Sequence, residues 1–162
     1  MPKSHSAGIL VYRRRTGSLE VLLVHPGGPF WARKDEGAWS IPKGEFSAGA
    51  DALEAARREF REETGSAIEG AFVALAPLRQ RSGKLVHAWA VEGDLDTSSI
   101  SSNTFSIEWP PRSGRQQQFP EIDQAAWFEI AAARRKILAG QRGFLDELQT
   151  RLNQACAGQP AA

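Results

Sequence analysis

The chain has few of the residues and segments that build crosslinked, membrane-spanning or strongly charged proteins. Cys156 is the single cysteine among 162 residues, so we expect neither an internal disulfide nor a cysteine-built zinc site. The 20 basic and 19 acidic residues give a formal net charge of +1, which provides no general attraction to DNA or to a membrane surface. No apolar run approaches the length that spans a bilayer, and residues 7–12 are too short for a signal-peptide core.

These exclusions favour one globular domain in a reducing cytoplasm. A chain of 162 residues that is 41% hydrophobic and 24% charged can bury a sizeable core without crosslinks. We expect the domain to occupy residues 1–156 and residues 157–162 to form a disordered tail. The composition indicates no particular oligomeric state.

Apolar runs and turn-forming segments alternate along the chain and predict an α/β fold. Residues 7–12 and 19–25 predict a hairpin around a turn at residues 15–18, and the second of its strands is apolar enough to be buried on both faces. Further strands are expected at residues 39–41, 71–78, 85–91 and 125–128. Helices are expected at residues 51–64, 130–138 and 144–155. Residues 94–119 lack clear periodicity and predict a long, functional loop.

The helix at residues 51–64 has the best-defined ends. Asp51 and Glu54 have the spacing of a capping box at its start, and Gly65 supplies the stop. At roughly 100° per residue, Glu59, Glu62 and Glu63 fall on one side of this helix, at the edge of its apolar stripe.

Three carboxylates on one helix side predict a metal site. Their mutual repulsion is unfavourable unless a cation intervenes, and carboxylate oxygens suit Mg²⁺ or Mn²⁺. Because Mg²⁺ usually binds a few carboxylates together with phosphate oxygens, the pattern also predicts a phosphate-bearing substrate. The alternative is a solvated helix face with ion pairs at i,i+4 spacing, Glu54 with Arg58 and Arg58 with Glu62.

The stretch from residue 44 to residue 66 resembles the signature of the Nudix hydrolases. That signature is a glycine, five residues, a glutamate, seven residues, Arg-Glu, an apolar residue, any residue, Glu-Glu, any residue, a glycine and an apolar residue. The matching residues, all in register, are Gly44, Arg58, Glu59, Phe60, Glu62, Glu63 and Gly65. Residues 39–44, Trp-Ser-Ile-Pro-Lys-Gly, are similar to the lead-in of members that act on nucleoside polyphosphates. The resemblance implies a single-domain α/β/α sandwich around a mixed sheet.

Two positions depart from the signature. Ala50 stands where the family has its first glutamate, and Ser66 stands where it has an apolar residue. The first departure removes a carboxylate that supports the metal-site network in the family, and it puts full catalytic strength in doubt. Asp51 or Glu54 would partly compensate for it.

The resemblance also implies roles for individual residues. Glu59, Glu62 and Glu63 would hold Mg²⁺, with Mn²⁺ as a substitute, and Arg58 would orient Glu59. Members of the family often carry a further glutamate outside the signature, and Glu121 is the candidate here, with a solvated loop acid as the equal alternative.

The remaining candidates are residues expected to contact phosphates. Lys43 and Gly44 lie at the start of the signature, where a positive charge and a close backbone approach suit a phosphate chain. Arg112 and Arg115, in the segment expected to be a loop, would clamp distal phosphates, because guanidinium groups form bidentate contacts with phosphate. Scattered surface arginines are the alternative reading of these two.

The function that follows is Mg²⁺-dependent hydrolysis of a pyrophosphate bond in a nucleoside or dinucleoside polyphosphate. The alternatives within this chemistry are RNA 5′ ends and nucleotide sugars as substrates. From another class, a catalytically impaired nucleotide-sensing module is the alternative that Ala50 motivates.

Overall fold

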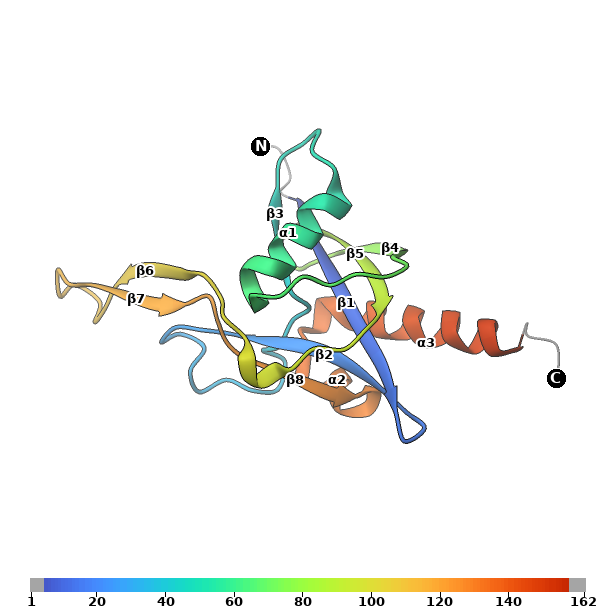
Figure 1. Cartoon of the computed structure of the whole chain (residues 1–162). Coiled ribbons are helices and arrows are strands. Elements are labelled where there is room, and N and C mark those ends of the chain that lie inside the picture. Colours follow the sequence, from blue (N-terminus) through green and yellow to red (C-terminus); the bar gives the residue numbers. More distant parts are fainter. Residues whose placement is uncertain (1–4, 158–162) are drawn as a thin grey trace.

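A mixed sheet forms the centre of the molecule (Figure 1). The computed structural model describes residues 5–157. The strands of the sheet are β1 (His5–Arg15), β2 (Ser18–Pro26), β3 (Lys43–Phe46), β4 (Val73–Arg79), β5 (Leu85–Glu92) and β8 (Ile122–Glu129). Their order is β4-β5-β1-β2-β8, with β3 paired to β1. The β1–β5 pair is parallel and the other pairs are antiparallel.

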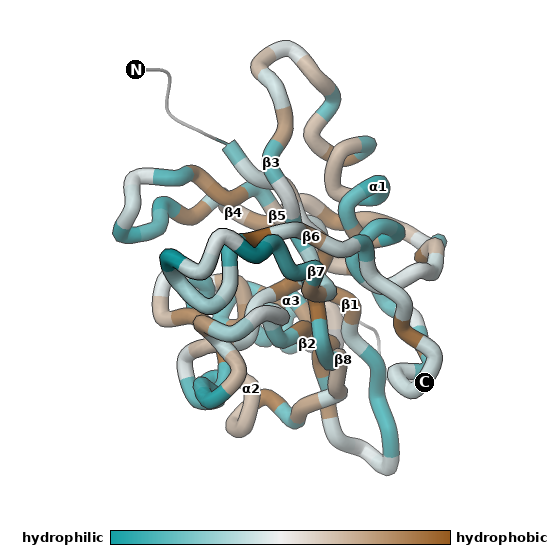
Figure 2. The backbone as a smooth tube through the Cα atoms, turned by 90° about the vertical axis from the view of Figure 1, so that its left-hand side faces the viewer, coloured by the Kyte–Doolittle hydropathy of each residue, from teal (hydrophilic) through white to brown (hydrophobic). Residues whose placement is uncertain are grey.

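Helices cover both faces of this sheet. The α1 helix (Ala52–Thr64) lies over one face, while α2 (Ile130–Lys136) and α3 (Arg142–Ala157) lie over the other (Figure 1). Side chains of β2 alternate between the two cores: Leu22 and Val24 pack in the α1 layer, and Val21 and Leu23 pack in the layer of α2 and α3. Hydrophobic segments gather in the central strands, whereas the β1–β2 turn is hydrophilic (Figure 2). The predicted sandwich and the burial of β2 on both faces are confirmed.

One edge of β1 is shared between two partners, and this division places the candidate site. The second half of β1 pairs with β2, from Tyr12 opposite Val21 onward, while its first half pairs with β3, where Ala7 lies opposite Gly44. Between the two, the backbone N–H of Ile9 donates to the carbonyl of Pro42 at 3.1 Å. The segment that leads into the signature is therefore fixed at the point where β2 separates from β1.

The α1 helix begins and ends where the sequence predicts. Asp51 Oδ1 accepts from the backbone N–H of Glu54 at 3.0 Å, and Gly65, at φ 78°, donates its N–H to the carbonyl of Arg61. A positive φ is strained for most residues, so a glycine suits this C-cap. The helix buries Ala55, Ala56, Phe60 and Thr64 against the sheet.

The predicted long loop at residues 94–119 is wrong in part. The segment contains a short 3₁₀ helix, η1 (Thr97–Ser99), and the hairpin of β6 (Thr104–Glu108) and β7 (Gln116–Pro120), which projects from the body (Figure 1). Apolar residues alternate in β6, with Phe105 and Ile107 half-buried, but two such positions are too few to establish periodicity.

Other boundaries need smaller corrections. The expected strand at residues 39–41 is wrong, because Trp39 and Ser40 form only isolated bridges, and the strand begins at Lys43. The helix expected at residues 130–138 ends at Lys136 and is followed by η2 (Ala139–Gln141). Of the expected tail, residue 157 ends α3, and residues 158–162 lie outside the described residues. In the described part, no helix is long and apolar enough to cross a membrane.

Candidate active site

At Gly44 the α1 helix lies so close to β3 that the strand has no room for a side chain. A Cβ atom on Gly44 would lie 2.0 Å from Glu59 Cδ, far inside van der Waals contact. The missing side chain lets the Glu59 carboxyl group rest directly on the strand. Gly44, the first residue of the signature, and Glu59 are therefore packed directly against each other.

Glu63 lies one turn further along α1 and is tied to the same strand. Its Oε2 accepts from the backbone N–H of Lys43 at 3.1 Å. Burial raises the pKa of the Glu63 carboxyl group to about 8, against the opposing effect of the nearby Lys43. Burial also lowers the pKa of the Lys43 ammonium group. The carboxyl group of Glu63 and the ammonium group of Lys43 are therefore both poorly solvated, and the charge of each favours the charged form of the other.

Arg58 connects the two remaining carboxylates of the helix. Its guanidinium group lies 3.3 Å from Glu59 Oε1 and 3.9 Å from Glu62 Oε1. The Glu59 side chain is 15% exposed and that of Glu62 is 39% exposed. Burial and then the charge of Glu62 raise the pKa of Glu59, while Arg58 opposes the shift. Arg58 thus contacts Glu59, and its orienting role stays a prediction.

Glu121 comes from a distant part of the chain and lies near the carboxylates of α1. It lies immediately before β8, where its carbonyl accepts from Gly27 N–H at 2.9 Å and its N–H donates to the carbonyl of Asn103 at 2.8 Å. The negative charge of Glu121 contributes to the raised pKa of both Glu59 and Glu63. The fold therefore brings Glu121 next to the helix carboxylates.

Glu63 and Glu121 line a hollow of roughly 200 Å³ whose other lining residues are mostly apolar. The remaining lining residues are Val24, Pro26, Trp31, Ala38, Ser40, Ile41, Lys43, Ile122 and Leu138. Trp31 and Ser40 were not among the site residues predicted from the sequence. The buried Gln141 holds this wall, because its Oε1 accepts from Ile41 N–H at 3.1 Å and its Nε2 donates to Ser40 Oγ at 3.0 Å. A lone glutamine in a helical segment gives no signal for such a role.

The donor set fits a divalent cation, although its side chains are not gathered around one point. Within residues 5–157, no group of three or more acidic, histidine or cysteine side chains is arranged as a ready metal site. Glu59 and Glu62 turn toward Arg58 instead. Burial disfavours the charged form of Glu63, and the Glu59 carboxyl group lies in the space that Gly44 leaves. A cation would stabilise both carboxylates, because it neutralises their charge at low solvent exposure.

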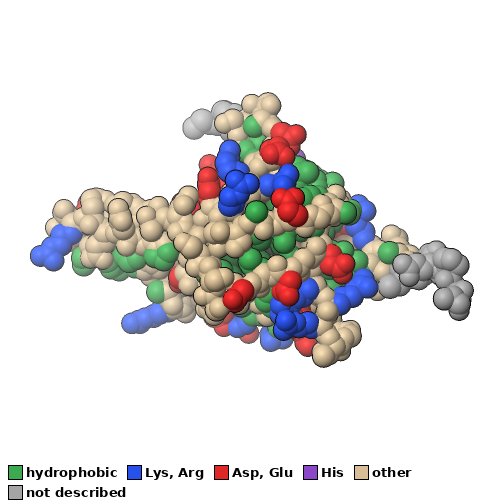
Figure 3. All heavy atoms as spheres, in the orientation of Figure 1, with side chains coloured by type: hydrophobic (Ala, Val, Ile, Leu, Met, Phe, Trp, Pro, Cys, Tyr) green, Lys and Arg blue, Asp and Glu red, His purple; other side chains and the backbone are tan. Residues whose placement is uncertain are grey.

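Arg112 and Arg115 do not join this cluster. Both are exposed and lie at the turn between β6 and β7 (Figure 1). Figure 3 shows basic side chains at the tip of the projecting hairpin, whereas acidic and basic side chains mix over α1. At the same hairpin, Trp109 packs edge-on against Phe30, which is 58% exposed, with ring centroids 5.5 Å apart.

The position of the missing first glutamate lies beside Arg58. Ala50 lines two open hollows, and Arg58 lines both of them as well. The neighbouring Asp51 is engaged as the helix N-cap. A carboxylate at position 50 would therefore have free space next to the guanidinium group.

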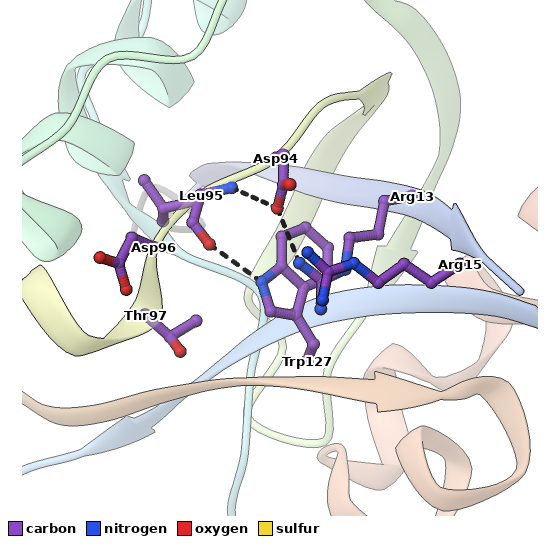
Figure 4. Close-up of a pocket in the computed structure, with 7 residues that line it drawn as sticks. All are labelled: Arg13, Arg15, Asp94, Leu95, Asp96, Thr97 and Trp127. Carbon is purple, nitrogen blue, oxygen red and sulfur yellow. Dashed lines mark hydrogen bonds and ion pairs between the residues drawn. The ribbon is translucent and has the colours of Figure 1, made fainter.

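A larger hollow, of roughly 530 Å³, lies elsewhere on the protein, near the C-terminal end of β1 and away from the end that holds Ala7 (Figure 4). Two of its charged residues, Arg13 and Asp94, already have partners: Arg13 bonds to Glu20 and Asp94, each at 2.7 Å, and its guanidinium carbon lies 4.0 Å from the centroid of the Trp127 ring. The Trp127 N–H donates to the carbonyl of Leu95 at 3.1 Å. This hollow holds none of the predicted site residues.

Comparison with known families identifies the class of protein. The NUDIX domain family matches residues 2–148, which is most of the chain, and the chain belongs to this family. Membership supports the enzyme class that the sequence predicts, a pyrophosphohydrolase. The comparison with curated protein sequences gave no significant match.

Solved structures show the same fold at low sequence identity. A C. elegans Ap4A hydrolase in a binary complex is 22% identical, with a TM-score of 0.64 over 93% of this chain and 98% of that one. The NUDIX domain of Shewanella oneidensis NrtR, solved with ADP ribose, is 14% identical, with a TM-score of 0.65 over 94% and 90% of the two chains. A MutT protein from Methanosarcina mazei is 17% identical, with a TM-score of 0.60 over 93% and 95%.

Proposed function

We propose that the protein hydrolyses a pyrophosphate bond in a nucleoside or dinucleoside polyphosphate with the help of Mg²⁺. The observation that carries this proposal is that Glu63 and Glu121 line one hollow together with Lys43. Glu59 is near enough for its charge to raise the pKa of Glu63, and the charge of Glu121 raises the pKa of Glu59. Family membership supports the reaction type. The Ap4A hydrolase and the ADP ribose complex among the similar folds support a nucleotide substrate. The expected cytoplasmic location stays a prediction.

In this proposal the residues have distinct tasks. Glu59, Glu62 and Glu63 would hold Mg²⁺ or Mn²⁺, which neutralises charge on the phosphate chain and activates water. Lys43 contributes a positive charge beside the phosphates, and Gly44 keeps the strand close to Glu59. Arg58 orients Glu59 through their 3.3 Å contact.

Proton removal from the attacking water requires a carboxylate that faces the hollow. Glu63 and Glu121 both line it, and Glu121 is not part of the helix signature. Most of the other residues that line the hollow are apolar, Trp31 among them, and Glu63 is largely shielded from water there. Water exclusion strengthens the interactions of the charged groups with a phosphate chain.

The test is a substrate panel with and without Mg²⁺. It contains dinucleoside polyphosphates, nucleoside triphosphates, nucleotide sugars and RNA with a 5′ triphosphate. We expect Mg²⁺-dependent turnover to be fastest with the dinucleoside polyphosphates or nucleoside triphosphates. Tight binding without turnover of any member would contradict the proposal and would favour the sensing module.

A further inference from the structure

We propose that residues 101–103 form a positioning strap that sets Glu121 against the acidic end of α1, and that Ser102 is its key positioning residue. The inference rests on the proposed function, in which Glu121 works together with the helix carboxylates. The strap lies between η1 and β6, in the segment that the sequence predicts to be a long, functional loop.

The strap is bound to α1 through carbonyl groups that the helix itself cannot use. The last four carbonyls of a helix have no partner within it. Here the N–H of Ser101 donates to the carbonyl of Thr64, and the N–H of Asn103 donates to the carbonyl of Glu62, each at 3.0 Å. These bonds fasten the strap to the turn that carries Glu62 and Glu63.

Gly65 lets the strap approach this helix end. A Cβ atom at Gly65 would lie 2.8 Å from the carbonyl oxygen of Ser101 and 3.1 Å from its Cβ. The signature glycine therefore serves two purposes: it ends the helix at positive φ, and it leaves space for the strap.

The other side of the strap holds the Glu121 backbone. The carbonyl of Asn103 accepts from the N–H of Glu121 at 2.8 Å. Ser102 Oγ accepts from the N–H of Ile122 at 3.2 Å. Its hydroxyl lies within donating distance of two carbonyl oxygens, that of Asn103 at 2.9 Å and that of Ile122 at 3.1 Å. One hydroxyl group thus contacts both backbone polar groups of Ile122, the residue next to Glu121. The strap connects the glutamates of α1 to Glu121 through an unbroken series of hydrogen bonds.

This arrangement explains how a glutamate far away in sequence keeps its register with the helix. Displacements of about 1 Å at a catalytic group can cost on the order of 10²-fold in rate. Ser102 is not among the residues that line the hollow, and its hydroxyl contacts the backbone of Ile122, the residue next to Glu121. It therefore acts on the position of Glu121 through Ile122.

The first test compares Ser102→Ala with Ser106→Ala. Ser106 Oγ lies 3.2 Å from Gln116 Oε1 within the hairpin, so its removal takes away one hairpin contact and leaves the strap intact. We expect Ser102→Ala to lower kcat about tenfold, with KM changed by less than about twofold, because the loss is one of orientation. Ser106→Ala keeps the parent kcat. Equal kcat values in the two variants would overturn the proposal.

A double variant separates positioning from a general structural effect. In the Glu121→Gln background, Ser102→Ala should cause no further loss of kcat, because the group it positions is already disabled. Multiplicative losses in the double variant would overturn the proposal.

Amide hydrogen exchange supplies a readout that needs no activity. In Ser102→Ala the amides of Glu121 and Ile122 should exchange at least about tenfold faster, while the amide of the buried Phe60 in α1 keeps its protection. Unchanged exchange at Glu121 would overturn the strap. Absence of turnover in the parent protein with every substrate would instead contradict the proposed function, and the exchange result would still decide the strap.

Discussion

The acidic end of α1 and the tip of the β6–β7 hairpin both carry charged residues, but their surroundings differ. At the helix, Glu59 fills the space left by Gly44, and burial raises the pKa of Glu63 to about 8. At the hairpin tip, Arg112 and Arg115 are exposed. Charges that are poorly solvated interact strongly with a ligand, whereas exposed charges are screened by water and salt. We therefore expect the helix to determine turnover and the hairpin to tune affinity.

The largest effect is expected from the helix carboxylates. Glu62→Gln or Glu63→Gln should lower kcat by at least about 10²-fold, because each removes a metal ligand at the reacting phosphate. Steady-state kinetics with saturating Mg²⁺ measures this, and circular dichroism confirms the fold. A parent-like kcat in both variants would show that the helix carboxylates do not determine turnover.

A substitution at Gly44 tests the close packing of strand and helix. Gly44→Ala should lower kcat about tenfold or more, because the new methyl group must displace the Glu59 carboxyl group. Gly140→Ala is the matched control, since its nearest neighbours would lie at 3.5 Å or beyond, in ordinary contact. Similar kinetics for the two alanine variants would show that Glu59 is not held by the strand.

The departure at Ala50 predicts a gain. Ala50→Glu should raise kcat several-fold, because the new carboxylate has room beside Arg58 and adds a charge-assisted hydrogen bond. Ala50→Gln, which has nearly the same shape without the charge, is the control. An unchanged kcat for Ala50→Glu would show that Arg58 is already held by Glu59 and Glu62.

At the hairpin tip the expected change is smaller. The double variant Arg112→Ala and Arg115→Ala should raise KM for a dinucleoside polyphosphate by up to about fivefold and leave kcat unchanged, as expected for exposed ionic contacts. Arg81→Ala, at the exposed turn between β4 and β5, is the control. A large fall in kcat would place the hairpin arginines in the reaction itself.

The last prediction concerns stability and pH in the metal-free protein rather than activity. The pKa of Glu63 rises from 4.5 to about 8 on folding, so the folded state holds this proton more tightly than the unfolded state. Its contribution to stability is complete below about pH 4.5 and is lost as the pH rises toward about 8. Thermal unfolding in a chelator should show a weaker decline over this range for Glu63→Gln than for the parent. Identical slopes would contradict the burial of Glu63.

The helix and the hairpin also differ in how far the sequence predicts them. The cap at Asp51, the stop at Gly65 and the spacing of the glutamates are local rules, so α1 and its acidic side follow from sequence alone. The position of Glu121 beside Glu63 depends on a long-range pairing of β2 with β8, for which the segment itself carries only a weak signal.

Several of the features that sequence reasoning missed are made by backbone groups. The strap at residues 101–103 is bound mainly through main-chain N–H and carbonyl groups, which every residue type possesses. The β6–β7 hairpin was missed because Pro110, Pro111 and Gly114 at its turn dominate the local pattern. The strand expected at residues 39–41 lies a few residues later in the chain, as β3, because Trp39 and Ile41 are buried without belonging to a strand.

The most direct test is a crystal structure with Mg²⁺ and a non-hydrolysable dinucleoside polyphosphate. The account predicts that Mg²⁺ lies about 2.1 Å from carboxylate oxygens of Glu59, Glu62 or Glu63 and contacts the phosphate chain, with Glu121 at the same hollow. A cation and phosphate chain bound away from α1, with these three carboxylates pointing into bulk solvent, would contradict it.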